Sequence, residues 1–272
     1  MNLRSVESLD LTGRRVFIRA DLNVPLDDQG NVSDDTRIRE SLPTVKLAMG
    51  KGARVVLASH LGRPKGKANP KYSLAPVAIR LGELLGRSVP LASDCVGPEV
   101  EKEAAALKDG EILLLENLRF HAEEEKNEPG FARGLAGLAD VWVNDAFGTA
   151  HRAHASTAGM AAFVREKAAG LLLLREVKLL SGLLLNPPSP FVAVIGGAKV
   201  SDKLAVLANL LSRADRILVG GAMAYTFLRA QGRQVGHSLV EPDRIPDAAS
   251  LLGDERAPRK LARQLLLAEI GV

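Results

Sequence analysis

Two glycines and two lysines stand together in the segment Phe191–Lys203, where they could bind a phosphate. Gly196 and Gly197 follow an apolar run, and because glycine has no Cβ the backbone can turn tightly there and approach a ligand. Lys199 and Lys203 lie four residues apart, so one helical turn would place both ammonium groups beside the same anion. The spacing matches neither of the common glycine-rich phosphate motifs. Since a strand that ends in glycines and leads into a helix is also common without a ligand, the pattern alone leaves both interpretations open.

Arginines follow three strand-like segments in the first part of the chain, namely Arg63, Arg119 and Arg152. The carboxyl ends of parallel strands share one edge of a sheet, so these side chains would meet on a common rim. Asp21 and Asn23 follow an earlier strand and would lie beside them. Arginine binds carboxylates and phosphates bidentately, so the pattern favours a small phosphorylated or carboxylated sugar acid as ligand.

Other polar residues have simpler interpretations. Arg37 lies in a charged turn, where a role at the start of a helix is favoured from the pattern alone. His151 and His154 have a spacing that metal ligands use, but no third ligand follows at a suitable distance, so no metal site is predicted. Cys95 is the single cysteine, which excludes an internal disulfide and indicates a reducing compartment.

Composition narrows the class of protein. The chain has 272 residues, 46% of them hydrophobic and 25% charged, which fits one large or two ordinary globular domains. The net charge is +4, but the cationic residues are interspersed with 32 acidic ones and aromatic residues are only 4% of the chain. Both features argue against a nucleic-acid partner. No targeting segment or run of membrane-spanning length is recognised, so a cytoplasmic protein is expected.

The elements that must position these residues alternate between strand and helix patterns. The expected strands are Val16–Arg19, Val55–Ala58, Ile112–Glu116 and Val141–Asn144, and the expected helices between them include Ser41–Lys51, Ala75–Leu85 and Phe131–Leu138. Such alternation predicts a parallel sheet with helices on both faces.

The last part of the chain predicts a second, smaller sheet. Leu171–Leu185 is helix-forming and apolar on nearly every face, which favours burial between two bodies, and prolines break it before Pro190. Two strand–glycine–helix units follow, with strands Phe191–Ile195 and Ile217–Val219 and helices Leu204–Ser212 and Met223–Gln231. A further helix pattern lies at Lys260–Glu269. These units make half of a nucleotide-binding sheet. The predicted fold is therefore α/β, with two Rossmann-like parallel-sheet domains joined by a helix and the second domain incomplete.

Six motifs, in order, resemble those of the phosphoglycerate kinase family. They are Asp21–Pro25 (DLNVP), Asp34–Arg39 (DDTRIR), Ser59–Gly66 (SHLGRPKG), Leu113–Phe120 (LLLENLRF), Val143–His154 (VNDAFGTAHRAH) and Gly196–Lys203 (GGAKVSDK). The resemblance covers nearly the whole chain, although Asp247–Pro258 looks like an insertion or a divergent stretch. It implies a glycolytic transferase that moves a phosphoryl group between 1,3-bisphosphoglycerate and ADP, giving 3-phosphoglycerate and ATP. The implied domains are residues 1–170 for phosphoglycerate, 171–190 as the joining helix and linker, and 191–272 for part of the nucleotide site.

The resemblance also implies residue roles in the first domain. Asp21 and Asn23 would hold the hydroxyl and carboxyl region of the substrate. Arg37 would touch the carboxyl that is phosphorylated and stabilise the transferring group. A basic patch would surround the substrate phosphate, and its members would be His60, Arg63, Arg119 and Arg152.

In the second domain the resemblance implies a site for ADP or ATP. Lys199 would follow the transferring phosphoryl group, and Lys203 would bind nucleotide phosphates. Gly197 and Gly221 would let the nucleotide lie against the backbone. Because substrate and nucleotide would sit on different domains, hinge closure about Leu171–Pro190 is expected to bring them together.

The sequence also departs from the family. Family members continue with further strands and a glycine-rich helix start whose aspartate takes Mg²⁺, and this chain has no comparable segment. The Mg²⁺ ligand is therefore expected to be absent and activity to be weak. The alternative is a non-catalytic phosphoglycerate-binding fragment without a working nucleotide and Mg²⁺ site. Small molecules are the expected partners, and a monomer is the expected state.

Overall fold

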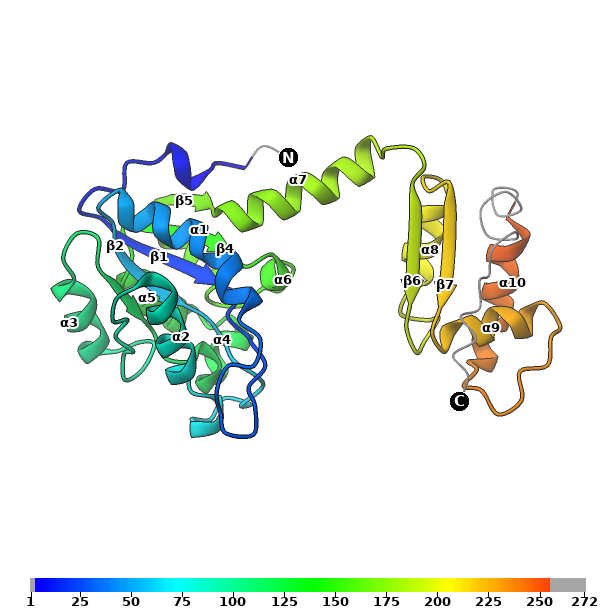
Figure 1. Cartoon of the computed structure of the whole chain (residues 1–272), viewed down its shortest axis with the longest axis horizontal. Coiled ribbons are helices and arrows are strands. Elements are labelled where there is room, and N and C mark those ends of the chain that lie inside the picture. Colours follow the sequence, from blue (N-terminus) through cyan, green and yellow to red (C-terminus); the bar gives the residue numbers. More distant parts are fainter. Residues whose placement is uncertain (1–2, 255–272) are drawn as a thin grey trace. The chain divides into compact units, whose positions relative to one another are not determined.

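The computed structural model describes residues 3–254 of the chain (Figure 1). It divides into two compact units, Met1–Lys178 and Leu179–Val272. This division falls inside the segment expected to join two domains. The helix expected at Lys260–Glu269 lies outside the described residues.

A five-stranded parallel sheet organises the first unit. Its order is β3-β2-β1-β4-β5, and every neighbouring pair is parallel. The strands are β1 (Arg15–Ala20), β2 (Arg54–Ala58), β3 (Ile112–Leu114), β4 (Val141–Asp145) and β5 (Glu166–Ala169). The predicted α/β class and the four predicted strands are confirmed. Strand β5 was not predicted, because the segment EKAA at this sheet edge has no apolar run.

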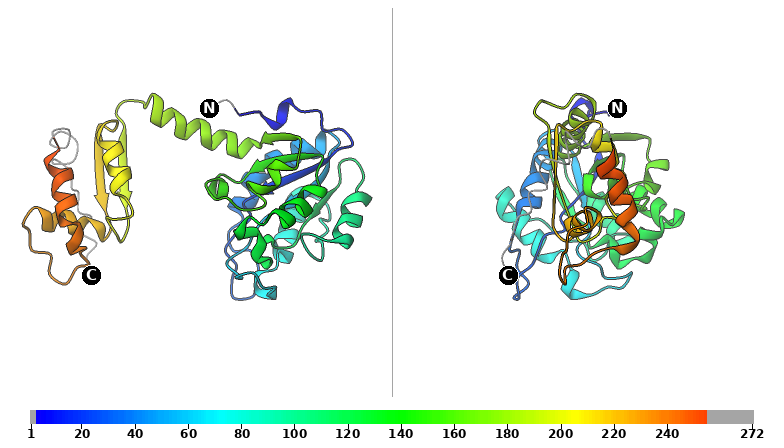
Figure 2. Two further views of the ribbon diagram at one scale, coloured as in Figure 1. Left: turned by 180° about the vertical axis from the view of Figure 1, so that it is seen from behind. Right: turned by 90° about the vertical axis from the view of Figure 1, so that its right-hand side faces the viewer.

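Helices cover both faces of this sheet (Figure 2). The α-helices of this part of the chain are α1 (Thr36–Gly50), α2 (Ala75–Leu85), α3 (Pro98–Ala106), α4 (Ala122–Lys126), α5 (Pro129–Gly137), α6 (Phe147–Ala150) and α7 (Leu171–Leu185). Short 3-10 helices lie at Val6–Ser8, Pro70–Tyr72, Leu118–Phe120 and Gly159–Ala162. Of these helices, α3, α4 and α6 fall in segments where the sequence prediction named no helix.

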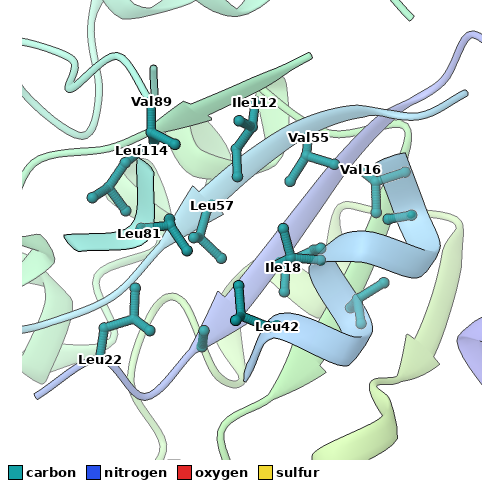
Figure 3. Close-up of a cluster of buried hydrophobic side chains, with 14 of the residues drawn as sticks. Val16, Ile18, Leu22, Leu42, Val55, Leu57, Leu81, Val89, Ile112 and Leu114 are labelled. Carbon is teal, nitrogen blue, oxygen red and sulfur yellow. The ribbon is translucent and has the colours of Figure 1, made fainter. Parts of the chain in front are cut away.

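Two apolar cores lie on opposite sides of the sheet because successive strand residues point to opposite faces. Val16 and Ile18 of β1 pack with Leu42 of α1 in one core (Figure 3). Phe17, between them in sequence, packs with Leu135 of α5 in the other. This alternation confirms helices on both faces and fixes which strand residues face each layer.

The first turn of α7 is anchored to the first unit. Asp145 accepts a hydrogen bond from the Leu173 amide at 3.1 Å, and Thr44 accepts one from the Leu171 amide at 2.9 Å. A Cβ at Gly170 would collide with the Asp145 carboxylate. The helix has the predicted bounds, and Leu173 is its buried residue within the first unit, while its burial between two bodies stays a prediction. The first unit covers only the beginning of the helix.

The second unit contains two strand–glycine–helix units, as predicted. The parallel strands are β6 (Val192–Gly196) and β7 (Arg216–Gly220), and the helices after them are α8 (Leu204–Leu211) and α9 (Met223–Ala230). A short 3-10 helix, Pro242–Arg244, leads into α10 (Ile245–Gly253). No helix was expected at α10, which buries Ala248 in the same apolar core as Phe227 of α9.

Candidate functional site

Hydrogen bonds join the loops that follow β1 and β2. The hydroxyl of Ser59 accepts from the Leu22 amide at 2.8 Å, and the side-chain oxygen of Asn23 accepts from the Gly62 amide at 2.7 Å. Both loops leave the carboxyl edge of the sheet, where ligands of parallel α/β proteins bind. The two predicted polar segments are therefore brought together at this edge.

The loop that follows β3 contacts the loops that follow β1 and β2 at Gly62. Arg119, after β3, donates to the Gly62 carbonyl at 3.0 Å. Asn117 donates to the carbonyl of Leu61 at 2.8 Å. The φ of Gly62 is +62°, and a Cβ there would lie 2.5 Å from the ring of Tyr72. Only glycine fits this left-handed position against the ring without strain.

Two of the strand-end arginines, Arg63 and Arg152, lie close enough to the third, Arg119, to act on it. Arg119 is 7% exposed. Burial is the largest effect that lowers the pKa of Arg119, and the positive charges of Arg152 and Arg63 lower it further. Both neighbours are exposed. We call Arg63, Arg119 and Arg152 the cationic rim.

Arg37 and Asp21 form an ion pair beside the rim. Arg37 is the second residue of α1, so its position matches the structural interpretation drawn from the sequence. Its charge also contributes to lowering the pKa of His60, which places it near the other candidate residues. Arg37 therefore stands at the start of a helix and also lies near the other candidate residues.

Beneath the rim lies a set of buried polar residues that we call the buried relay: Glu124, Ser156, Arg19 and His60. The hydroxyl of Ser156 donates to Glu124 at 2.5 Å and accepts from Nε of Arg19 at 2.9 Å. Nη2 of Arg19 lies 3.1 Å from Nδ1 of His60. Burial, followed by the charge of Arg19, lowers the pKa of His60 to about 2.

Sequence reasoning identified only His60 in the buried relay. Arg19 could have been noticed as a single cation at the end of an otherwise apolar strand. Glu124 lies in the run AEEEK, where nothing in the pattern distinguishes it from its solvent-facing neighbours. The contacts that mark these residues join parts of the chain that are distant in sequence.

In the second unit, the glycines after β6 and β7 approach each other closely. A Cβ at Gly221, whose φ is +67°, would lie 2.8 Å from the carbonyl oxygen of Gly197. The same carbonyl accepts from the Met223 amide at 2.9 Å. We call residues 196–203, together with Gly221, the glycine turn.

The expectation that Lys199 and Lys203 share one helical turn is wrong. Helix α8 begins after Lys203, so Lys199 lies in the loop before it. The reason is Glu241, whose carboxylate accepts from the Ser201 amide at 3.1 Å and the Ser201 hydroxyl at 2.7 Å, and also from the Val200 amide. These bonds hold the loop in a non-helical shape. This role of Glu241 was not predicted, because Glu241 lies about 40 residues further along the chain.

Among residues 3–254, one group has metal-ligand geometry: Asp94, Cys95 and His121, whose ligand atoms lie within 4.8 Å of one another. Nε2 of His121 already lies 2.7 Å from Asp94, and burial raises the pKa of the Cys95 thiol well above its ordinary value. A set with sulfur and nitrogen does not fit Mg²⁺, which prefers oxygen ligands. His151 is exposed and His154 is buried.

The fold and the site define a class: a two-unit α/β protein with a cationic rim on a parallel sheet and a glycine turn in a second parallel sheet. The family model for phosphoglycerate kinase matches residues 6–265. The chain belongs to the phosphoglycerate kinase family, whose members transfer a phosphoryl group to or from a carboxyl group. The expected family is therefore confirmed.

Named relatives and solved structures agree with this assignment. A phosphoglycerate kinase of Anaeromyxobacter sp. (strain K) is 62% identical over 98% of this chain and 67% of its own length. The cytosolic phosphoglycerate kinase of Triticum aestivum is 56% identical over 99% of this chain and 67% of its own. The structure of phosphoglycerate kinase from Coxiella burnetii aligns with a TM-score of 0.80 at 45% identity, covering 92% of this chain and 62% of that one. The chain thus spans about two thirds of the length of these relatives.

Proposed function

We propose that this chain serves the glycolytic reaction of its family, the reversible transfer of a phosphoryl group between 1,3-bisphosphoglycerate and ADP that gives 3-phosphoglycerate and ATP. The observation that carries the proposal is the cationic rim, in which Arg63 and Arg152, from two loops, act on Arg119, from a third, at the carboxyl edge of the sheet. Glu125, 3.3 Å from Nε of Arg119, offsets part of the charge that three separate loops bring together at this rim, and an anion with more than one charged group would offset the rest.

Each candidate site residue of the first unit has a role in this proposal. The rim and His60 hold the phosphate of the phosphoglycerate. Because Oδ1 of Asn23 is occupied by the Gly62 amide, its Nδ2 is the group left to donate to the substrate. Asp21 accepts from a substrate hydroxyl and orients Arg37 through their ion pair. Arg37 then stabilises the transferring phosphoryl group beside the substrate carboxyl.

The glycine turn of the second unit is the proposed nucleotide site. Gly197 and Gly221 leave the backbone open for ADP or ATP, and the exposed Lys199 follows the transferring phosphoryl group. Lys203, at the start of α8, binds the nucleotide phosphates. The reaction uses ATP or ADP with Mg²⁺, and the one group of three possible ligands among the described residues contains sulfur and nitrogen, which do not suit this ion, so no step is assigned to it.

The proposed reaction needs no nucleophile from the protein. In the direction of ATP use, a carboxylate oxygen of 3-phosphoglycerate attacks the γ-phosphorus while the bond from that phosphorus to the bridging oxygen breaks. The products are the acyl phosphate and ADP, and charge and atoms balance. The protein contributes positive charge and position, which is how phosphoryl transfer is usually catalysed.

The division of labour follows the expected domains, with residues 1–170 for phosphoglycerate, 171–190 as the joining segment and 191–272 for the nucleotide. We expect a monomer without a nucleic-acid partner. A cytoplasmic location is proposed from the cytosolic relatives. Among the described residues, no helix is both long enough and apolar enough to cross a membrane.

A second candidate is phosphoglycerate binding without turnover, and the observation that favours it is that all three arginines of the rim belong to the first unit. Calorimetric titration of the chain with 3-phosphoglycerate and with ATP, followed by a coupled assay with Mg²⁺, separates the two candidates. Binding of both ligands with turnover supports the kinase. Binding of 3-phosphoglycerate alone supports the second candidate, and failure to bind 3-phosphoglycerate contradicts both.

A further inference from the structure

The guanidinium of Arg19 is fully buried at the end of β1, and its contacts point in three directions. Nε donates to the hydroxyl of Ser156 at 2.9 Å, and Nη1 donates to the Ala20 carbonyl. Nη2 lies 3.1 Å from Nδ1 of His60. Every contact therefore has an arginine donor, because a guanidinium has no acceptor atom.

This geometry determines which ring nitrogen of His60 carries the proton. A nitrogen that accepts from Arg19 must present a lone pair, so Nδ1 is unprotonated. A neutral imidazole then carries its single proton on Nε2. The doubly protonated ring would place an N–H against the Arg19 donor, and it is disfavoured further by burial, since His60 is 5% exposed.

The position of Arg19 is itself determined by a buried carboxylate. Glu124 is 1% exposed and accepts from both the amide of Ser156 at 2.9 Å and its hydroxyl at 2.5 Å. Because that hydroxyl donates to Glu124, its lone pairs face Arg19. One hydroxyl thus links two buried charges of opposite sign and fixes the guanidinium relative to the ring of His60.

We propose that Glu124, Ser156 and Arg19 are positioning residues that lock His60 in the Nε2–H tautomer, so that His60 offers one neutral hydrogen-bond donor to bound phosphoglycerate. No described residue hydrogen-bonds Nε2 of His60, which leaves that donor for a ligand. The ligand role rests on the proposed function, whereas the tautomer does not. A neutral donor adds directional binding to the rim without adding another positive charge beside Arg119, on which Arg63 and Arg152 already act.

The direct test is a ¹⁵N–¹H correlation spectrum of the imidazole rings in the full chain labelled with ¹⁵N-histidine. The chain has five histidines, and the His60→Gln variant assigns the signals of His60. We expect a protonated-type shift for Nε2, an unprotonated-type shift for Nδ1, and no change of either between about pH 5 and 8. A protonated Nδ1, averaged shifts or titration in this range overturns the proposal.

Variants test whether the buried relay holds His60 in its single tautomer. Arg19→Met combined with Glu124→Gln removes both buried charges together, so neither is left unpaired. His60 is expected to lose its single tautomer and to titrate, and the affinity for 3-phosphoglycerate is expected to fall about tenfold. The matched control is Arg15→Met, on the same strand, where Arg15 pairs with Asp140 at 2.7 Å away from the relay. It should keep both the tautomer and the affinity.

If the double variant does not fold, Ser156→Ala removes only the linking hydroxyl, and the spectrum of His60 should then show a mixture of tautomers. An unchanged single tautomer in a folded variant contradicts the relay. If the wild-type chain binds 3-phosphoglycerate but shows the other tautomer, this inference fails and the proposed function stands. If the tautomer is locked but 3-phosphoglycerate does not bind, the proposed function fails and so does the ligand role of His60.

Discussion

The cationic rim of the first unit and the glycine turn of the second unit differ in what holds their charged groups. Arg119 is 7% exposed and donates to the backbone of a neighbouring loop, and the relay lies beneath it. Lys199 is exposed, and the loop that carries it is held by the carboxylate of Glu241. Within the rim, Arg119 is therefore oriented by burial and side-chain contacts, whereas the glycine turn orients Lys199 through the backbone.

This difference suits the two proposed ligands. Phosphoglycerate is small and offers few contacts. Its binding affinity therefore depends strongly on protein cations that are held in position before it binds. A nucleotide lies along open backbone, and the lysine that follows a moving phosphoryl group needs freedom. We expect substitutions at the rim to act strongly on one ligand only, and substitutions at the turn to act more weakly on the other.

The largest effect is expected for Arg119→Met. Removal of a buried cation that touches both the Gly62 loop and the proposed phosphate should lower the affinity for 3-phosphoglycerate by about a hundredfold. Calorimetric titration measures it. Lys199→Met should leave this affinity within about twofold of wild type. An equal loss of affinity in both variants would contradict the claim that only the rim binds 3-phosphoglycerate.

A smaller effect is expected for Gly62→Ala. The added Cβ meets the ring of Tyr72 at a φ of +62°, which should lower the free energy of unfolding by roughly 1–3 kcal/mol and weaken phosphoglycerate binding. Gly30→Ala is the matched control, because its φ is +84° and a Cβ there meets nothing within 4 Å. Urea unfolding of both variants is the measurement, and equal losses would show that the ring of Tyr72 has no effect.

The pH dependence of stability tests the burial of His60 in the first unit. Burial, then the charge of Arg19, lowers the pKa of His60 from 6.5 to about 2. Below about pH 6.5, His60 is protonated in the unfolded chain but stays neutral in the folded chain. The free energy of unfolding should therefore fall as the pH decreases from there. The contribution is at most about 1.4 kcal/mol per pH unit. His60→Gln should reduce this slope in urea unfolding at pH 7, 6 and 5, and an unchanged slope would contradict a buried neutral ring.

The smallest effect is expected for Glu241→Gln at the glycine turn. The amide retains one acceptor oxygen but loses the charge that holds two backbone amides and the hydroxyl of Ser201. The affinity for ADP should fall by about threefold to tenfold, and that for 3-phosphoglycerate should not change. Asp215→Asn is the control, since Asp215 accepts from the Phe191 amide at the other end of β6. A loss of affinity for 3-phosphoglycerate in E241Q would contradict the claim that Glu241 acts only on the glycine turn.

The sequence was most informative where local pattern and tertiary role coincide. Val16–Arg19 and Val141–Asn144 are apolar runs because both their faces are buried, so their strands were predictable. The edge strand β5 has no such run, and it was missed. The rim was predictable because parallel strands bring their following loops to one edge.

The remaining features depend on contacts between distant segments. Lys199 was expected on a helix because nothing near it in sequence shows that Glu241 holds its loop. Arg19, Glu124 and Ser156 are ordinary residues in the sequence, and only the folded chain joins them to His60. Side-chain networks of this kind have no local signature.

The central claim is that arginines from three loops act on one small anion. Titration of 3-phosphoglycerate into the chain and into Arg63→Met, Arg119→Met and Arg152→Met tests it directly, with Arg54→Met as control because Arg54 pairs with Asp109 at the opposite end of β2. The account predicts weaker binding in all three rim variants and wild-type affinity in the control. Wild-type affinity in any one of the three rim variants would contradict it.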